Sequence, residues 1–264
     1  ISILSRAGFD VLHAVNGQQA FKIAEAGNID IVLMDISMPG LNGIEATRQI
    51  QQRYPDVRVV VLKGAGKNFS SGADMSLLAN VADSHQWLEG MRHLNQIITK
   101  LREMPQPIVT ALRGAAYGAG ANLALASDFV VAADDAKFCE IFVHIGAVLD
   151  AGGTYFLPRL VGLSKARELA MLGNEIDGKT AAAIGLIYKS VPDDKLDDEV
   201  AALTANLALK PPAAMSLIKA GLNESFDRSL KDILDWEAAH QAIRIQTPEL
   251  KEIVAGFLKS RGKD

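Results

Sequence analysis

Short apolar runs that alternate with helix-length segments are the feature that most constrains the fold. Residues 9–14, 31–35 (IVLMD) and 57–62 (VRVVVL) are such runs, and the segments between them have helical spacing. The order strand, helix, strand, helix, strand favours a parallel sheet with right-handed crossovers. Two later runs, 107–112 (PIVTAL) and 128–134 (DFVVAAD), are also predicted as strands. The sequence therefore predicts an α/β protein.

The longest predicted helices lie later in the chain. Residues 193–221 and 228–259 have helical periodicity, interrupted only by the prolines near positions 211 and 248. Residues 84–104 form another amphipathic segment, and its apolar stripe consists of Trp87, Met91, Leu94, Ile98 and Leu101.

Composition excludes several classes of protein. The 264 residues carry a net charge of -4 and no stripe of lysine and arginine, so we expect no nucleic-acid partner. Cys139 is the single cysteine, which excludes an intrachain disulfide and a cysteine-based metal site, and we expect a buried, inert thiol in a cytoplasmic protein. The first residues lack the pattern of a signal peptide. The most apolar stretch, residues 114–126, is too short to cross a bilayer, so we expect no membrane association.

Small residues gather in two loops, GAGKNFSSGADM at 64–75 and YGAGAN at 117–122. A glycine turn that opens a helix presents backbone N–H groups and the positive end of the helix, and small residues let a ligand approach the backbone. Close packing of helices is the alternative explanation of such loops.

Residues 56–264 resemble the crotonase (enoyl-CoA hydratase/isomerase) superfamily. The resemblance rests on VVVLKGAGKNFSSGADM, PQPIVTALRGAAYGAGANLALASDFVVAAD and IGAVLDAGGTYFLPRLVGLSKARELAMLG. It implies a ββα spiral core with a helical C-terminal region and an acyl-CoA substrate, with no cofactor beyond the coenzyme A of that substrate and no metal. It also implies a homotrimer or homohexamer and a role in fatty acid metabolism or phenylacetate degradation.

By the same resemblance, the backbone N–H groups of Ala73 and Ala119 form an oxyanion hole that stabilises a thioester enolate. The resemblance also implies a substrate path, with Lys63 and Lys67 at the phosphates of coenzyme A unless both are merely solvated. The substrate-binding positions are Ser71, Asp74, Met75, Gly120, Phe142, Gly152 and Phe257.

The acid–base residues indicate which reaction occurs. A typical hydratase has two glutamates, but this chain has Asn122 and Phe142 at those positions, which disfavours hydration. Asp150 remains as the working acid, at the position used by some enoyl-CoA isomerases and by epoxyphenylacetyl-CoA isomerases. We expect Phe142, Val148 and Leu149 to form an apolar wall that raises its pKa.

Several alternatives stay open. Asp150 is also suited to cap the helix that follows it, and Asn122 either binds substrate or only packs. A dehalogenase-like thioester hydrolase needs an activating histidine, for which His93 and His144 are candidates. An inactive, coenzyme-A-binding chimera is the remaining class.

Residues 1–62 resemble a fragment of a response-regulator receiver domain, through DIVLMDISMPGLNGIEATRQI and PDVRVVVL, with Asp35 at the phospho-accepting position. The acidic pair that holds Mg²⁺ and the lysine that contacts the phosphoryl group are missing, so Asp35 has no visible partners for phosphoryl transfer. We expect this fragment to replace the usual crotonase N-terminus within one continuous α/β domain.

Overall fold

The computed structural model describes residues 17–25, 31–35, 58–74, 76 and 83–261. The chain divides into two compact units, one made of residues 1–103 and 107–208, the other of residues 104–106 and 209–264. Two predicted elements, the strand at 9–14 and the helix at 41–54, lie outside the described residues.

A parallel sheet is the centre of the first unit, as the sequence predicts. Its described strands have the order β1-β2-β3-β5-β8. All four neighbouring pairs are parallel, and Leu33 of β1 lies opposite Val61 of β2. The receiver-like segment and the crotonase-like segment therefore contribute neighbouring strands to one sheet. The strands are β1 (Ile31–Asp35), β2 (Val59–Lys63), β3 (Ile108–Leu112), β5 (Phe129–Ala133) and β8 (Lys189–Val191).

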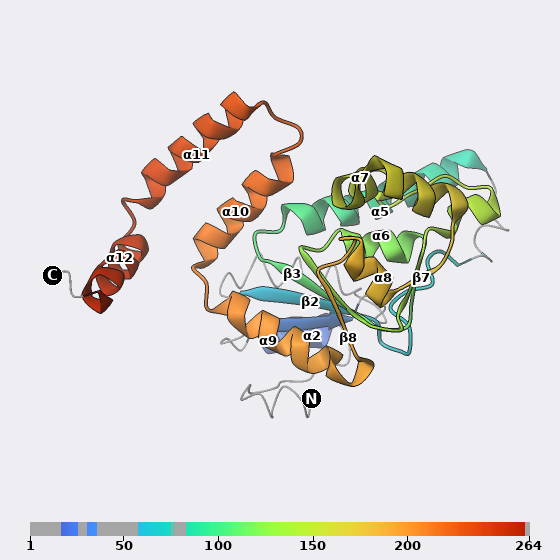
Figure 1. Ribbon diagram of the computed structural model, residues 1–264, viewed down its shortest axis with the longest axis horizontal. Coiled ribbons are helices and arrows are strands. Elements are labelled where there is room, and N and C mark those ends of the chain that lie inside the picture. The colour runs from blue at the N-terminus through green and yellow to red at the C-terminus, as the bar shows by residue number, and fades with distance from the viewer. Residues whose placement is uncertain (1–16, 26–30, 36–57, 75, 77–82, 262–264) are drawn as a thin grey trace. The chain divides into compact units, whose positions relative to one another are not determined.

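The interior strands are almost wholly apolar, with Thr110 of β3 and Lys63 at the end of β2 as the exceptions, because helices cover both faces of the sheet. Figure 1 shows α5 and α6 on one side of the sheet and α9 on the other. Leu62, Leu101 and Ile108 are completely buried in the resulting core. Burial of each such side chain stabilises the fold by about 1.5–3 kcal/mol. The predicted stripe of α5 follows this pattern, since Ile98 and Leu101 near its C-terminal end are its buried residues.

A second, smaller sheet was not predicted. Its described strands are β4 (Ala115–Tyr117), β6 (Lys137–Cys139) and β7 (Ile176–Asp177), in the order β4-β6-β7. Strands of two or three residues are too short to show a period of two in the sequence. This sheet matters for the site, because β4 leads directly into α6.

The helices of the first unit include one irregular member. Helix α7 contains a break at Gly162, where the backbone has φ 72° and ψ 161°. The described helices of this unit are α2 (Gly17–Glu25), α5 (Ser84–Glu103), α6 (Ala119–Leu125), η1 (Ile141–Ile145), α7 (Gly153–Leu172), α8 (Gly178–Ala183), η2 (Asp193–Lys195) and α9 (Leu196–Ala208).

The second unit is helical, as predicted for the C-terminal region. Ser229 and Thr247 accept backbone hydrogen bonds as N-caps of α11 and α12, which explains where these helices begin. The buried Lys219 of α10 donates from Nζ to the carbonyl of Gln106 at 3.0 Å. Among the described residues no helix is long and apolar enough to cross a membrane. The helices are α10 (Pro212–Glu224), α11 (Leu230–Arg244) and α12 (Pro248–Ser260).

Candidate active site

Ser70 joins the two glycine-rich loops. Its backbone N–H donates to the carbonyl of Ala115 at 3.0 Å, and its carbonyl accepts from the N–H of Tyr117 at 3.0 Å. Ser70 thereby forms a one-residue parallel bridge with β4. The loop after β2 and the turn before α6 are consequently held side by side, although about fifty residues separate them in the chain.

Two glycines allow this close approach. A Cβ atom on Gly72 would lie 2.8 Å from the carbonyl oxygen of Tyr117 and 3.7 Å from the amide nitrogen of Ala119, and Gly72 has φ 87°. A Cβ atom on Gly120 would lie 2.5 Å from the Cβ of Ser70. Side chains would therefore push the two loops apart, so glycine is required by sterics at both positions.

The two predicted oxyanion amides lie in these loops. Ala73 follows Gly72, and Ala119 is the first residue of α6. Among the described residues, neither amide donates a backbone hydrogen bond within the chain. This arrangement is compatible with the predicted oxyanion hole, and the positive end of α6 would add to the attraction for a developing negative charge.

Asn122 is a polar side chain at the centre of the site and is completely buried. Its Nδ2 donates to Oε2 of Glu140 at 3.2 Å and to the backbone carbonyl of Asp150 at 3.0 Å. Packing alone, one of the two roles open from the sequence, does not describe this residue. It connects α6 to the loop that carries the predicted acid.

Asp150 is half-buried, and its Oδ1 atom has no hydrogen-bond partner in the described part of the chain. Burial raises its pKa. The capping alternative is wrong, because the N-cap of α7 is Gly152 and no side chain caps this helix. The next residue, Ala151, has φ 47°. A left-handed backbone is uncommon for alanine and directs the chain sharply beside the acid.

The apolar wall predicted around Asp150 is only partly formed. Phe142 is buried, and its ring would lie 3.5 Å from a Cβ atom on Gly118, next to the start of α6. Leu149 is half-buried. The prediction for Val148 is wrong for this chain, since that side chain is 84% exposed.

Glu140 is a second carboxyl group that the sequence analysis missed. It lies between β6 and η1 and is 1% exposed. Its pKa is raised from 4.5 to about 8, mainly by burial and further by the charge of Asp150, while the hydrogen bond from Asn122 acts in the opposite direction. Asp150 is therefore not the lone carboxylate at the site. The missed signal was a charged residue enclosed by the apolar residues of KFCEIFV.

The predicted residues of the coenzyme A path have varied surroundings. Ser71 and Asp74 are exposed, and Asp74 accepts from the amide of Ser76 at 2.8 Å. Lys63 lines a pocket with Gly64, Gly66 and Arg113, whereas Lys67 is an exposed loop residue outside that lining. These assignments stay predictions.

The other predicted residues are found in three different places. Phe257 is exposed on α12 of the second unit. Met75 and the side chain of Asp35 lie outside the described residues. Gly152 is the N-cap of α7.

Neither candidate histidine is placed to activate Asp150. His93 is exposed on α5, and the ring of His144 makes a 2.9 Å hydrogen bond with the carbonyl of Gly173.

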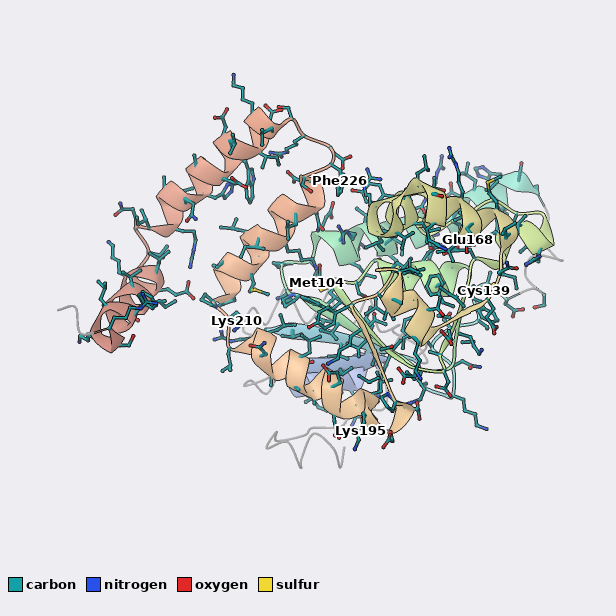
Figure 2. All side chains as sticks on the ribbon, viewed as in Figure 1. Met104, Cys139, Glu168, Lys195, Lys210 and Phe226 are labelled. Carbon is teal, nitrogen blue, oxygen red and sulfur yellow. The ribbon has the colours of Figure 1, made fainter. Side chains whose placement is uncertain are left out.

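Cys139 donates to the same carbonyl of Gly173 and is buried, which confirms the expected buried thiol. Figure 2 labels it beside α6 and α7. Within the described residues no cluster of acidic, histidine or cysteine side chains is suited to a metal ion.

Comparison with known proteins decides the family. The family model for enoyl-CoA hydratase/isomerase matches residues 44–264. The chain belongs to the enoyl-CoA hydratase/isomerase family. A second model, the response regulator receiver domain, matches residues 1–80. The two matches overlap over residues 44–80, which include β2.

The relatives of this enoyl-CoA hydratase/isomerase family member include both kinds of enzyme. It is 34% identical to 1,2-epoxyphenylacetyl-CoA isomerase of Escherichia coli, over 82% of this chain and 84% of the relative. It is 36% identical to a probable enoyl-CoA hydratase of Rhodobacter capsulatus, with the same coverage. A solved enoyl-CoA hydratase from Polaromonas sp. JS666 has a TM-score of 0.82 at 29% identity and covers 90% of this chain and 97% of its own. The predicted crotonase fold is confirmed.

Proposed function

We propose that this family member is an acyl-CoA isomerase that moves a double bond from the 3,4 to the 2,3 position of an enoyl-CoA. The observation that carries the proposal is the carboxyl group of Asp150. It is half-buried, one of its oxygens has no partner within the described residues, and Asn122 ties its backbone to the helix that supplies an oxyanion amide. One carboxylate that both removes and returns a proton is what an isomerase requires.

The reaction proceeds in two proton transfers. The carboxylate of Asp150 removes a proton from C2, and the electrons of that bond form a dienolate whose oxygen accepts hydrogen bonds from the N–H groups of Ala73 and Ala119. The protonated Asp150 then returns the proton to C4. The thioester carbonyl re-forms, and the double bond lies between C2 and C3. The amides act on the oxygen as it becomes negative, and each such donor contributes on the order of 3 kcal/mol in related sites.

Hydration is disfavoured because the side chains at the two hydratase positions do not exchange protons. Asn122 is an amide and Phe142 is a hydrocarbon, and both are buried. The names of the similar proteins fit both activities, and an isomerase of trans-2-decenoyl-[acyl-carrier-protein] from Streptococcus mutans is 30% identical over 80% of this chain. Thioester hydrolysis with an activating histidine is disfavoured by the bond between His144 and Gly173.

A turnover assay tests the proposal. Straight-chain 3-enoyl-CoAs, 2-enoyl-CoAs and a halobenzoyl-CoA are offered to the wild-type protein, and products are identified by mass and ultraviolet absorbance. We expect 3-enoyl-CoA to become 2-enoyl-CoA without a change of mass. Asp150→Asn should lower kcat by at least about 1,000-fold, because the amide cannot accept the proton. Asp198→Asn changes an exposed aspartate on α9 and should leave kcat unchanged.

Other products would replace the proposal with a specific alternative. A gain of 18 mass units from 2-enoyl-CoA, as one water is added, would identify a hydratase. Loss of halide or of free coenzyme A would identify the dehalogenase or hydrolase class. Binding of the thioesters without turnover, unaffected by Asp150→Asn, would identify an inactive chimera.

Self-association as a trimer or a pair of trimers is part of the same proposal. Large apolar side chains are exposed on all three helices of the second unit, among them Leu222, Leu234 and Phe257. Where such side chains form a contiguous patch, a partner usually covers it. Light scattering during size-exclusion chromatography measures the mass of the assembly, and a monomer would contradict this part.

A further inference from the structure

Glu140 has a side chain that the proposed reaction does not use. It is the residue before η1, but it makes no side-chain cap of that helix. Its Oε2 accepts from Nδ2 of Asn122 at 3.2 Å, while Oε1 is buried with no partner in the described part of the chain. A buried glutamate with half of its hydrogen-bonding capacity unused is costly unless a further bond is made.

The amide oxygen of Asn122 also lacks a hydrogen-bond partner. Oδ1 is buried, and it too has no partner among the described residues. An ionised carboxylate only accepts hydrogen bonds, so it cannot serve an amide oxygen. A neutral carboxylic acid carries one O–H donor. A neutral carboxylic acid and a primary amide can form a ring of two hydrogen bonds, of which the N–H···O bond is already present here, and a proton on Oε1 would supply the donor that Oδ1 lacks.

We propose that Glu140 is a positioning residue of the isomerisation, held as the neutral acid in a two-bond pair with Asn122 that fixes Asp150 and keeps a second negative charge away from it. The inference rests on the proposed function. Its basis is the pair of complementary unsatisfied atoms, and burial of Glu140 favours the neutral form independently.

The pair fixes Asp150 through the backbone. Asn122 uses its second Nδ2 hydrogen for the carbonyl of Asp150. Gly153 lies directly against this amide, since a Cβ atom on Gly153 would lie 2.5 Å from Nδ2. A change in the position of the amide would alter its bond to the carbonyl of Asp150 and thereby the position of the acid.

The titratable surroundings of Glu140 are few. Helix α6 carries no titratable side chain. Asp150 raises the pKa of Glu140, and Glu140 raises that of Cys139. The neighbouring elements η1 and α7 also carry titratable side chains. Those closest in sequence to Glu140 are His144, Tyr155 and Arg159. Glu140 has a raised pKa of about 8, so the proposal predicts that kcat falls above that pH, as ionisation breaks the pair.

Two substitutions at Glu140 separate the proposal from a catalytic or a merely structural role. In Glu140→Gln the new amide can form the same two bonds with Asn122, so kcat near pH 7 should stay within about threefold of wild type, and the alkaline fall should disappear. In Glu140→Leu, Nδ2 of Asn122 keeps only its bond to the carbonyl of Asp150 and Oδ1 cannot be satisfied, so kcat should fall about 10-fold to 100-fold with little change in KM. Cys139→Ala is the control and should keep the alkaline fall.

Infrared difference spectroscopy tests the protonation without substrate. The wild-type spectrum minus that of Glu140→Gln should contain the carbonyl band of a neutral carboxylic acid near pH 7, and this band should vanish at alkaline pH. Since it needs no turnover, this result remains decisive if the protein proves to have no isomerase activity. A carboxylate band at neutral pH would overturn the proposal. So would a loss of activity in Glu140→Gln as large as in Glu140→Leu, or an alkaline fall that Glu140→Gln retains.

Discussion

Glu140 makes the stability of the fold depend on pH. Its pKa is about 8 in the folded chain and 4.5 when unperturbed. Between these values the unfolded chain has lost the proton while the folded chain keeps it, so stability falls as pH rises through this window. Below this window Glu140 is protonated in both the folded and the unfolded chain, so it causes no loss of stability there.

Glu140→Gln should therefore gain stability relative to wild type as pH increases. The gain should be small near pH 4 and grow to on the order of a few kcal/mol by about pH 8, because the amide never ionises. Urea unfolding followed at several pH values measures it. Glu237→Gln, which changes an exposed glutamate on α11, should show no such trend. A constant difference at every pH would contradict the raised pKa.

The sequence predicted the loops of this site better than its polar interior. Ala73 and Ala119 follow from glycine patterns that the resemblance makes specific, and the structure brings their loops together. Glu140 was missed because its role depends on Asn122, which is eighteen residues away and only meets it after folding. Asp150 was identified, but the choice between capping and a free carboxyl group needed the backbone of Gly152.

At the scale of elements, the spacing between α6 and the loop after β2 sets the distance between the two amides proposed to form the oxyanion hole. Gly120→Ala should lower kcat/KM about 100-fold, because its Cβ atom would push against Ser70 and shift Ala73 relative to Ala119. Gly90→Ala on α5 is the matched control, since no atom lies within 4 Å of its added Cβ.

The two glycine substitutions should differ in their effects on stability and on activity. Gly90→Ala should raise the free energy of unfolding by up to about 1 kcal/mol and leave activity unchanged. Steady-state kinetics and chemical denaturation of both variants measure the two effects. Unchanged kcat/KM in Gly120→Ala would mean that the amides do not depend on this contact.

Long elements were predictable, and short ones were not. The stripe of α5, the buried strands β2, β3 and β5, and the helices after residue 193 all carry enough residues to show their period. The strands β4, β6 and β7 have two or three residues each, and pairing with Ser70 or with one another creates them. Their existence is a property of the tertiary structure.

At the scale of the whole molecule, the junction between the two resemblances lies inside one sheet. Residues of β1 pair with β2 from Ile31 opposite Val59 to Asp35 opposite Lys63. The receiver-like segment is thus a structural part of the first unit. The hypothesis of one continuous domain stays a prediction that this pairing supports.

Proline substitutions in β1 test that hypothesis. Val32→Pro and Leu33→Pro each remove one N–H group, and neighbouring residues of a strand direct these groups to opposite sides. One of the two variants should lose a bond to β2 and destabilise the first unit by roughly 3 kcal/mol or more, and the other should be tolerated better. In calorimetry, the destabilised variant should unfold at a lower temperature than wild type, and this unfolding transition should coincide with the loss of activity. Loss of a separate, earlier transition with full activity retained would indicate an independent N-terminal domain.

The position of β1 at the end of the sheet also bears on solubility. The first four residues of β2 are apolar and at most 1% exposed, and only Lys63 at its end is exposed. A bare edge of such a strand is a template for pairing with other chains and for aggregation. The receiver-like segment, through β1, therefore covers an edge of β2 that would otherwise be open to pairing with other copies. Its removal should lower the solubility of the protein.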